Sequence, residues 1–583
     1  MKETSKASQR RSRESSFVQN YFVGDGIDIG DLDDPLSAHQ QAFPCIRSVL
    51  EWNALQKDAE TMHGVPEGRY DFVHSSHCLA NFNNPGKVLT RWLELLKPGG
   101  YAVITVPDED LYGHGEWPSR FNAKHLRSFT VCKPERGLAR SVNLLELVST
   151  LAPIASCERL TVIREHYDPA RRDIDQTAEG PAECAIELVL RKREVPSPAE
   201  LFNRAVDSDS TAEAVTACDR VMRTYPYRFD VYFYVAKELL RRNVPACGDA
   251  VWEQCVKHLE GEHLPRLYQV LHLIASGKLQ EGFALREALV RPFGTKRRTK
   301  VEPPHTIPEW QGESLKGKSI AIWSEFGLGD EIFFLRFARI FREQCGAARV
   351  VAVCQMPLVE LYEASGELDQ VIGVEQASQL PAVDYWVFPH AIPVWLPLDL
   401  EHLPQTTPYL HAPEGVISRM PPVERGKLKV GIVFKGDPTH ENDKSRSLPS
   451  LAVLDDVLRL EGIEYFSLQK GAGADEAARY ALTHAHFHDI GAQVKTMAET
   501  ASVIAELDVV IAVDTSVAHL AGAMNKPVLL MLPAYGDWRW HYIREDSPWY
   551  PSVRLYRCSL EHEGWQHVVE RIAGKLVEMR AAL

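Results

Sequence analysis

The chain has 583 residues, too many for one hydrophobic core, so several domains are expected. Hydrophobic residues make up 45% and charged residues 25%, proportions typical of globular proteins, and no apolar run approaches the length of a membrane span. A formal net charge of −14 disfavours general nucleic-acid binding, and 11 cysteines without a C-x-x-C pair argue against a disulfide framework or a zinc cluster.

The N-terminal segment is polar and basic. Its first twenty residues lack the apolar stretch of a secretory signal, so a cytoplasmic location is expected. Residues 1–15 are expected to be a disordered tail, because they carry few apolar side chains to bury. A first α/β domain is predicted over residues 16–195.

A glycine turn follows the first predicted strand of this domain, at residues 26–30. Further strands are predicted at residues 48–52, 70–75 and 103–107, and an L-K-P-G-G turn precedes the last of them. These segments resemble the class I S-adenosylmethionine-dependent methyltransferases, which implies a Rossmann-like fold. By this resemblance, the candidate residues for binding S-adenosylmethionine are Asp28, Gly30, Asp58 and Ala59.

Three features depart from that family. Asp31 and Leu32 stand where its members usually continue with glycine, so side chains occupy positions at which backbone should meet the cofactor. Asn53 replaces the acidic residue that would hold the ribose hydroxyls, and residues 80–82 replace the usual Glu-His pair. These departures favour a domain that keeps the fold without the cofactor, and active methyl transfer stays an alternative.

The pattern changes to helical over residues 196–290. Apolar residues recur at helical spacing in six segments, at residues 199–206, 212–222, 231–240, 248–259, 265–274 and 279–288. Paired short helices are typical of tetratricopeptide-like repeats, although a plain helical spacer would have the same pattern. Residues 291–316, rich in proline and charge, are predicted to be a linker.

Residues 317–415 are predicted to be the first half of a second α/β region. A strand at residues 318–325 runs into a G-L-G-D turn that ends at Asp330 and opens an amphipathic helix at residues 331–343. The turn permits close backbone approach, and the helix dipole would favour the ionised form of Asp330. Asp330 is therefore either a site residue or an N-terminal helix cap.

Residues 416–583 are predicted to be the second half. The polar loop after its strand at residues 429–434 carries the candidate ligand contacts Lys435, Gly436, His440 and Arg446. Fixed cations beside a glycine turn suit a diphosphate because they neutralise its charge, although a solvated loop could hold the same residues by chance. Lys470, at a later glycine turn, is a candidate contact to a phosphate or a base.

A strand–helix–strand unit is predicted at residues 508–533. The first strand stops at Asp514, and Thr515 or Ser516 is expected to cap the helix and leave free amides at its positive end. His519, one turn on, could face the same ligand. Open α/β sheets usually bind phosphorylated ligands at such strand ends, although an ordinary βαβ unit would show the same pattern.

Three motifs occur in order in this half. They are G…F-K-G…H…R-S at residues 431–447, D-T-S-x-x-H-L-A-G-A-x-x-K-P at residues 514–527 and D-W-R-W…R-x-D-S-P-W-Y-P at residues 537–551. They resemble the family 9 glycosyltransferases, the heptosyltransferases, and their tetratricopeptide-linked relatives. The resemblance implies a GT-B fold of two Rossmann-like halves, with Asp330 as the catalytic base. It also implies inversion at the anomeric carbon and a nucleotide-sugar donor, ADP-heptose or a UDP-sugar.

The sequence therefore predicts a glycosyltransferase that moves a sugar, with heptose among the candidates, to a hydroxyl of a protein or surface glycan. Neither a metal nor a cofactor is required in this interpretation, because protein cations and a helix end stabilise the leaving group. S-adenosylmethionine is a less favoured ligand, and no nucleic-acid partner is expected. Two alternatives stay open: a methyltransferase whose C-terminal half is accessory, and a non-catalytic scaffold.

Overall fold

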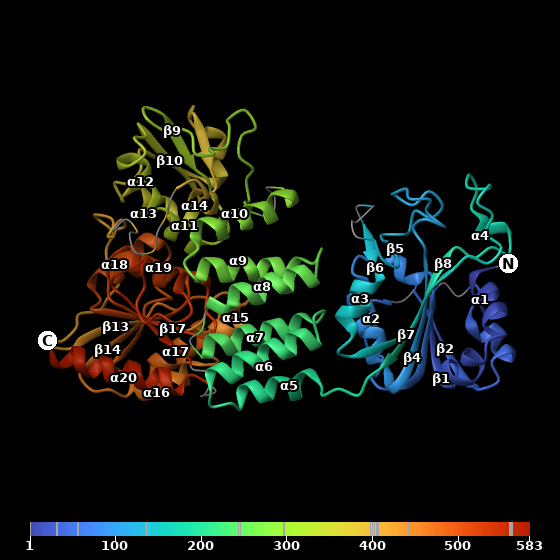
Figure 1. Cartoon of the computed structure of the whole chain (residues 1–583). Helices are drawn as coiled ribbons and strands as arrows, with labels where there is room; N and C mark the ends of the chain where they lie inside the picture. Colours follow the sequence, from blue (N-terminus) through green and yellow to red (C-terminus); the bar gives the residue numbers. More distant parts are fainter. Residues whose placement is uncertain are drawn as a thin grey trace. The chain divides into compact units, whose positions relative to one another are not determined.

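The computed structural model describes every residue except 1, 31–32, 55–57, 134–137, 139, 243, 245, 295–297, 397, 399, 401–402, 404–406, 441 and 559–563. The unusual positions 31 and 32 thus lie outside the described residues. Contacts divide the chain into two compact units, Met1–Arg266 and Leu267–Leu583 (Figure 1). The dividing point falls inside the predicted helical region.

The first unit contains a six-stranded sheet. Its strands, in spatial order, are β2 (Ile46–Asn53), β1 (Gly24–Gly30), β3 (Tyr70–Ser76), β4 (Leu96–Pro107), β8 (Ala185–Lys192) and β7 (Ala155–Ile163). Strand β8 is antiparallel to both neighbours, and the remaining pairs are parallel. A small parallel pair, β5 (Ser128–Thr130) and β6 (Ser141–Asn143), lies outside this sheet. The Rossmann-like fold class predicted for this domain is confirmed.

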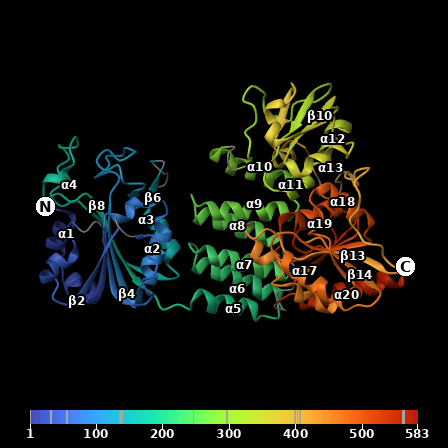
Figure 2. The same ribbon diagram turned by 180° about the vertical axis from the view of Figure 1, so that it is seen from behind.

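Helices cover both faces of this sheet. Helix α1 (Glu3–Arg11) lies on one face, and α2 (Pro85–Glu94) and α3 (Leu144–Leu151) lie on the other (Figures 1 and 2). A short helix, α4 (Gln176–Glu179), precedes β8.

The prediction of a disordered tail is wrong for residues 3–11, which form helix α1. Its Arg11 side chain is fully buried and donates to Glu187 Oε2 at 2.7 Å and to Thr105 Oγ1 at 2.8 Å. Arg10 donates to Glu183 Oε2 at 2.9 Å. A basic segment is ordered here because the final strand region supplies buried carboxylates, a tertiary pairing that composition does not reveal.

All six predicted helices of residues 196–290 are present. They are α5 (Pro198–Val206), α6 (Thr211–Thr224), α7 (Phe229–Arg241), α8 (Ala246–His258), α9 (His263–Ala275) and α10 (Leu279–Val290). Helices α5 to α8 belong to the first unit, whereas α10 belongs wholly to the second. The predicted helical region is therefore shared between two compact units.

The second unit contains two parallel sheets. The four-stranded sheet is, in spatial order, β11 (Gln370–Gly373), β10 (Arg349–Cys354), β9 (Ser319–Ile322) and β12 (Tyr385–Val387). The six-stranded sheet is β15 (Phe487–Asp489), β14 (Ile463–Ser467), β13 (Leu428–Val433), β16 (Val509–Val513), β17 (Val528–Leu532) and β18 (Val553–Arg557). All of their pairings are parallel, so the expected double-Rossmann arrangement is confirmed.

Helices surround each sheet of the second unit (Figure 2). The first half contains α11 (Leu328–Phe334), α12 (Phe337–Glu343), α13 (Val359–Glu363) and α14 (Ile392–Trp395). The second half contains α15 (Asp443–Arg446), α16 (Asp455–Leu458), α17 (Ala474–Thr483), α18 (Met497–Glu506), α19 (Ser516–Ala523) and α20 (Gln566–Ala581). The single helix predicted at residues 331–343 is two helices, broken at Arg336, whose Nε–H donates to the Phe333 carbonyl at 2.8 Å.

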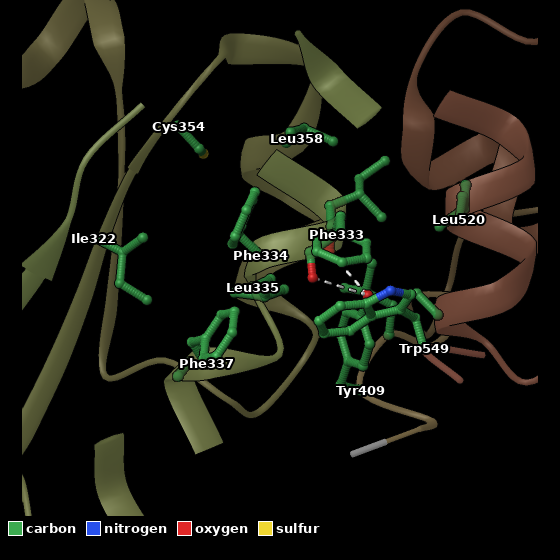
Figure 3. Close-up of a cluster of buried hydrophobic side chains, with 14 of the residues drawn as sticks. Ile322, Phe333, Phe334, Leu335, Phe337, Cys354, Leu358, Tyr409, Leu520 and Trp549 are labelled. Atoms are coloured by element: carbon green, nitrogen blue, oxygen red, sulfur yellow. Dashed lines mark hydrogen bonds between the residues drawn. The ribbon is translucent and has the colours of Figure 1, made fainter. Parts of the chain in front are cut away.

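The two halves share a buried aromatic core. Phe333 of α11 packs edge-on against Trp549, with ring centroids 5.0 Å apart, and Tyr409 donates to the Ile332 carbonyl at 3.0 Å (Figure 3). Arg336 crosses from one half to the other, donating to the Trp549 carbonyl at 2.8 Å. This core holds the start of α11 beside helix α19 of the second half.

Candidate functional site

The sheet topology creates a switch point in the first half. From β9 the chain moves outward to β10 and β11, and it then returns to place β12 on the other side of β9. Ligands of open α/β sheets bind where strand order reverses in this way, at the carboxyl ends of the strands. The segments that follow β9 and β12 carry Glu325, Asp330 and His390.

A second switch point lies in the other half, between β13 and β16. Strand β13 is paired with β14 on one side and with β16 on the other. Its carboxyl end leads to Lys435 and Arg446, while the end of β16 leads to Asp514 and helix α19. The topology therefore brings together the two loops that the sequence singled out.

The N-terminus of α19 is open. Thr515 occupies the capping position, but its side chain makes no cap hydrogen bond and instead donates to the Val513 carbonyl at 3.2 Å. The prediction of a hydroxyl cap from Thr515 is therefore wrong, because that hydroxyl turns back toward the strand. Ser516 is the first residue of the helix rather than its cap. The uncapped amides and the dipole make this helix end attractive to an anion.

Two cations lie in the segment that follows β13, the strand that pairs with β16. Lys435 Nζ pairs with Glu476 Oε1 at 2.5 Å. Arg446 Nε is buried without a hydrogen-bond partner among the described residues, and Asp443 Oδ1 lies 3.7 Å from it. A Cβ at Gly436 would lie 2.9 Å from the Arg446 guanidinium, so glycine is what allows that side chain to pack over the loop. The buried, unpaired N–H gives Arg446 unused capacity for an oxyanion.

The other two predicted ligand contacts in this half, Lys470 and His440, have hydrogen-bond partners within the protein. Lys470 Nζ donates to the Val494 carbonyl at 2.6 Å. His440 is exposed in its loop, and its Nδ1 accepts the Asn442 N–H at 3.2 Å. The structure therefore brings Arg446 and Lys435 to the end of β13, and it gives Lys470 a local structural role.

Asp514 and His519 form a buried pair. The two side chains approach at 3.6 Å between Asp514 Oδ1 and His519 Nε2, and His519 Nδ1 lies 3.1 Å from the Tyr550 hydroxyl. The imidazole stacks on Trp540 and is 5% exposed, so it supports Asp514 from within the core. Burial acts to raise the pKa of Asp514, but His519, Arg539 and Arg446 outweigh it and lower that pKa.

Asp330 lies across from helix α19. It is the third residue of α11 and accepts the Gly327 N–H at 3.1 Å, so it caps this helix. A Cβ at Gly329 would lie 3.1 Å from His519 Cδ2 and 3.6 Å from the Ser516 Cα. The glycine therefore allows the Asp330 turn to sit directly against the open helix end.

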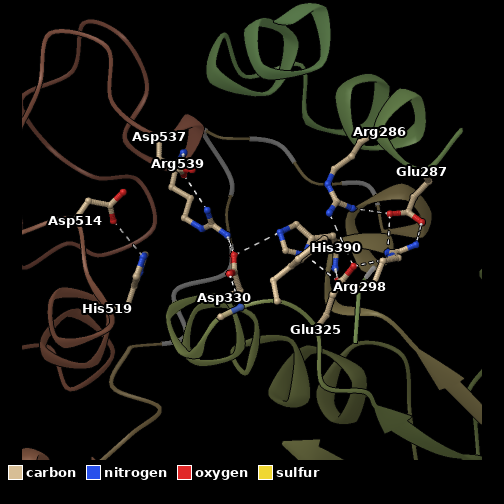
Figure 4. A network of polar contacts seen from close by, with 12 residues as sticks. Arg286, Glu287, Arg298, Glu325, Asp330, His390, Asp514, His519, Asp537 and Arg539 are labelled. Carbon is tan, nitrogen blue, oxygen red and sulfur yellow. Dashed lines mark hydrogen bonds and ion pairs between the residues drawn. The ribbon is translucent and has the colours of Figure 1, made fainter. Parts of the chain in front are cut away.

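The environment of Asp330 keeps its carboxylate ionised. Arg539 pairs with Asp330 Oδ1, and His390 Nε2 lies 3.6 Å from the same oxygen (Figure 4). Burial acts to raise the pKa of Asp330, but the charge of Arg539 and the hydrogen bond from the Gly327 N–H act in the opposite direction, and that pKa is lowered. Arg539 is itself anchored by Asp537 at 2.8 Å, and its Nε is buried without a hydrogen-bond partner among the described residues.

A buried ionic network extends from Asp330 away from α19 (Figure 4). Its members are Arg286, Glu287, Arg298, Glu325 and His390. Sequence reasoning missed all five as site residues, and it noted Arg539 only within a motif. Their position after strands could have indicated two of them. Glu325 and His390 follow strands that lie at a switch point, where open α/β sheets usually bind ligands.

The predicted cofactor residues of the first unit are already engaged. Both carboxylate oxygens of Asp28 are used, by the His74 imidazole and the Leu36 N–H, each at 2.6 Å. Asp58 Oδ1 accepts the N–H groups of residues 60 and 61. The Ala59 carbonyl accepts the Trp92 indole N–H at 2.9 Å.

Gly30 also has room around it, since an added Cβ would meet its nearest atoms only at 3.9 Å. Close backbone approach of a ligand is the usual reason for glycine at this position, and the space around Gly30 would permit it. A role of these four residues in binding S-adenosylmethionine stays a prediction.

Two family models match parts of the chain. Residues 466–572 match glycosyltransferase family 9 (heptosyltransferase), and residues 15–139 match a methyltransferase domain family. Protein FlbA of Caulobacter vibrioides is 25% identical over 336 residues, which cover 53% of this chain and 54% of that protein. The chain thus spans about half the length of this curated relative.

Solved structures resemble parts of the chain. The ADP-heptose lipopolysaccharide heptosyltransferase II of Escherichia coli is 12% identical, covering 45% of this chain and 99% of its own, with a TM-score of 0.32. A candidate methyltransferase from Bacillus halodurans is 12% identical, covering 32% and 96%, with a TM-score of 0.21. In the part of the chain that the structure describes, no helix combines the length and apolar character needed to cross a membrane.

Proposed function

Since the chain carries a glycosyltransferase family 9 domain and a methyltransferase domain, we propose that its second unit transfers a sugar from a nucleotide-diphosphate donor to a hydroxyl acceptor. One observation carries the proposal. The open end of α19 and the partly unpaired Arg446 converge on one switch point, and the turn that bears Asp330 packs directly against that helix end.

The donor diphosphate would lie at the end of β16. The amides of the first turn of α19 and the guanidinium of Arg446 suit its oxyanions, and Lys435 would exchange Glu476 for phosphate. These groups stabilise the negative charge that develops on the leaving diphosphate. Because they do the work of a divalent cation, the proposed reaction requires no metal.

Asp330 would deprotonate the acceptor. Its carboxylate is ionised and 24% exposed, so it can accept a proton from a hydroxyl group. Attack on the anomeric carbon from the side opposite the diphosphate inverts its configuration. We propose ADP-heptose or a UDP-sugar as the donor and a protein or surface-glycan hydroxyl as the acceptor, with the helices of residues 196–290 as a tetratricopeptide-like acceptor platform.

Calorimetric titration with ADP-heptose, UDP-sugars, bare nucleotides and S-adenosylmethionine tests the proposal. We expect saturable binding of a nucleotide sugar by the wild-type protein. Arg446→Ala removes a charge-assisted contact of about 1.5–3 kcal/mol, so the Kd should rise roughly 10- to 100-fold. Arg459→Ala is the matched control, because Arg459 is exposed and pairs with the neighbouring Asp455 on the same helix surface.

Two other outcomes would select other functions. Binding of S-adenosylmethionine alone would favour a methyltransferase, the activity to which the match at residues 15–139 points. Binding of no ligand from the panel would favour a scaffold built on two enzyme folds. A sugar-nucleotide signal equally strong in the Arg446 and Arg459 variants would remove Arg446 from the donor site.

A further inference from the structure

Three ionisable side chains form a line at the first switch point. Glu325 Oε2 lies 2.9 Å from His390 Nδ1, and His390 Nε2 lies 3.6 Å from Asp330 Oδ1 (Figure 4). Glu325 is fully buried and the His390 side chain is 5% exposed, whereas Asp330 is 24% exposed. The line therefore runs from the partly exposed Asp330 into the protein interior.

Glu325 fixes the orientation of His390 on the side of the ring opposite Asp330. Glu325 Oε2 accepts both the backbone N–H of His390, at 3.0 Å, and its Nδ1–H. Arg298 holds the other oxygen of Glu325 at 2.6 Å, so the carboxylate cannot rotate away. With its proton committed to Nδ1, a neutral imidazole presents the lone pair of Nε2 to Asp330.

Burial and one nearby cation favour this neutral form. The aromatic rings of Phe283, Phe326 and Phe334 pack against the imidazole, and Arg286 of α10 adds positive charge nearby. Burial and Arg286 lower the pKa of His390, against the opposing effects of Glu325 and Asp330. The imidazole is thus ready to gain a proton rather than already carrying one.

Asp330 alone is poorly suited to keep a proton. Its oxygen Oδ1 is shared with the Arg539 guanidinium, and that cation favours the ionised carboxylate. A base whose proton affinity is lowered in this way takes up a proton only briefly. A second group within reach of the same oxygen would relieve this conflict.

We propose that His390 is that second group, receiving at Nε2 the acceptor proton that Asp330 removes, with Glu325 holding the resulting imidazolium. This inference rests on the proposed glycosyl transfer. The acceptor O–H bond breaks as its oxygen bonds to the anomeric carbon. The bond from that carbon to the diphosphate breaks, and its electron pair leaves with the diphosphate. The proton passes through Asp330 to His390, which later releases it to water.

Two substitutions separate the relay from a structural role. His390→Asn retains an N–H that can donate to Glu325 but leaves no group facing Asp330. His390→Gln lacks the imidazole base as well. A purely structural histidine should be replaced well by asparagine, whereas a proton acceptor should be replaced by neither residue.

The assay is release of nucleoside diphosphate from ADP-heptose and UDP-sugars across a pH series, with water as the acceptor where no other is known. In the wild-type protein, kcat should fall on the acid side as His390 becomes protonated. Both variants should bind donor normally, lose about 10²- to 10⁴-fold in kcat, and lose that acid-side dependence.

The outcomes are distinguishable. If the wild-type protein binds and cleaves no sugar nucleotide, the proposed function fails and the relay fails with it. If the wild-type protein cleaves the donor and His390→Asn keeps its rate and its acid limb, glycosyl transfer stands and the relay alone is overturned. Calorimetric donor binding by both variants shows that the site has kept its fold.

Discussion

Glu331 offers a test of the electrostatics beside Asp330. It follows Asp330 in α11 and is 5% exposed, with its carboxyl accepting from the Ser324 hydroxyl and from the Gln355 N–H at 3.0 Å. Burial raises the pKa of Glu331 to about 7, against the opposing effect of those hydrogen bonds. The folded protein therefore holds a proton on Glu331 that the unfolded chain releases near its ordinary value of 4.5.

The raised pKa of Glu331 predicts how stability should change with pH, in both direction and magnitude. Between pH 4.5 and about 7 the folded state binds more protons at this site than the unfolded state, so stability falls as the pH rises through that window. A shift of this size corresponds to about 3 kcal/mol. Glu331→Gln replaces the carboxyl with a neutral amide of similar shape and should remove this pH dependence.

Urea unfolding of the wild-type protein and Glu331→Gln, followed by tryptophan fluorescence at pH 5 and pH 8, measures the effect. From pH 5 to pH 8, the free energy of unfolding should fall by about 3 kcal/mol more in the wild-type protein than in the variant. Glu343→Gln, at the end of α12, serves as a control on an exposed glutamate. A difference between Glu331→Gln and wild type that stays constant with pH would refute the assigned protonation state.

Three further predictions concern the same unit. Arg298→Met removes one of the two cations that Glu325 and Glu287 share and leaves Arg286 beside them, so it should cost about 3–5 kcal/mol in urea unfolding. A loss below about 1 kcal/mol would contradict the network. Gly329→Ala places a Cβ 3.1 Å from a carbon of the His519 imidazole, so it should lower the free energy of unfolding by about 1–3 kcal/mol and slow sugar transfer. Gly574→Ala, in open space on α20, is the control and should be neutral or stabilising. Equal effects of the two substitutions on stability would argue against the close approach at Gly329. Sugar transfer should be unchanged by a chelator such as EDTA, and activity lost to EDTA and restored by Mg²⁺ would contradict the proposed role of the protein cations.

Most strands and helices could be predicted because each carries a local signal. The apolar run of β16, for example, stops at Asp514, and a helix of small apolar residues follows. Apolar residues at helical spacing likewise located α5 through α10. The exceptions had no local signal: α1 is held by buried carboxylates of a distant strand region, and the break at Arg336 depends on contacts across the second unit.

The sequence predicted some residues of the candidate site correctly and missed others. The cationic loop and the helix end follow strands that are adjacent in the sheet, and each has recognisable residues at a strand end. The capping role of Thr515 was mistaken because a hydroxyl can donate to a preceding carbonyl as readily as it accepts from the helix, and sequence does not distinguish these geometries.

The ionic network could not be predicted from the sequence for a different reason. Arg286 and Glu287 come from a helix that the sequence assigns to a spacer, yet in the second unit they meet Arg298 and Glu325 behind His390. Because α10 supplies charges that orient His390, part of the helical region contributes to the candidate site. Glu287→Gln should therefore weaken the hold on Arg298, loosen the imidazole and slow sugar transfer even where donor binding persists. An unchanged transfer rate in this variant would show that α10 only packs against the first Rossmann-like half.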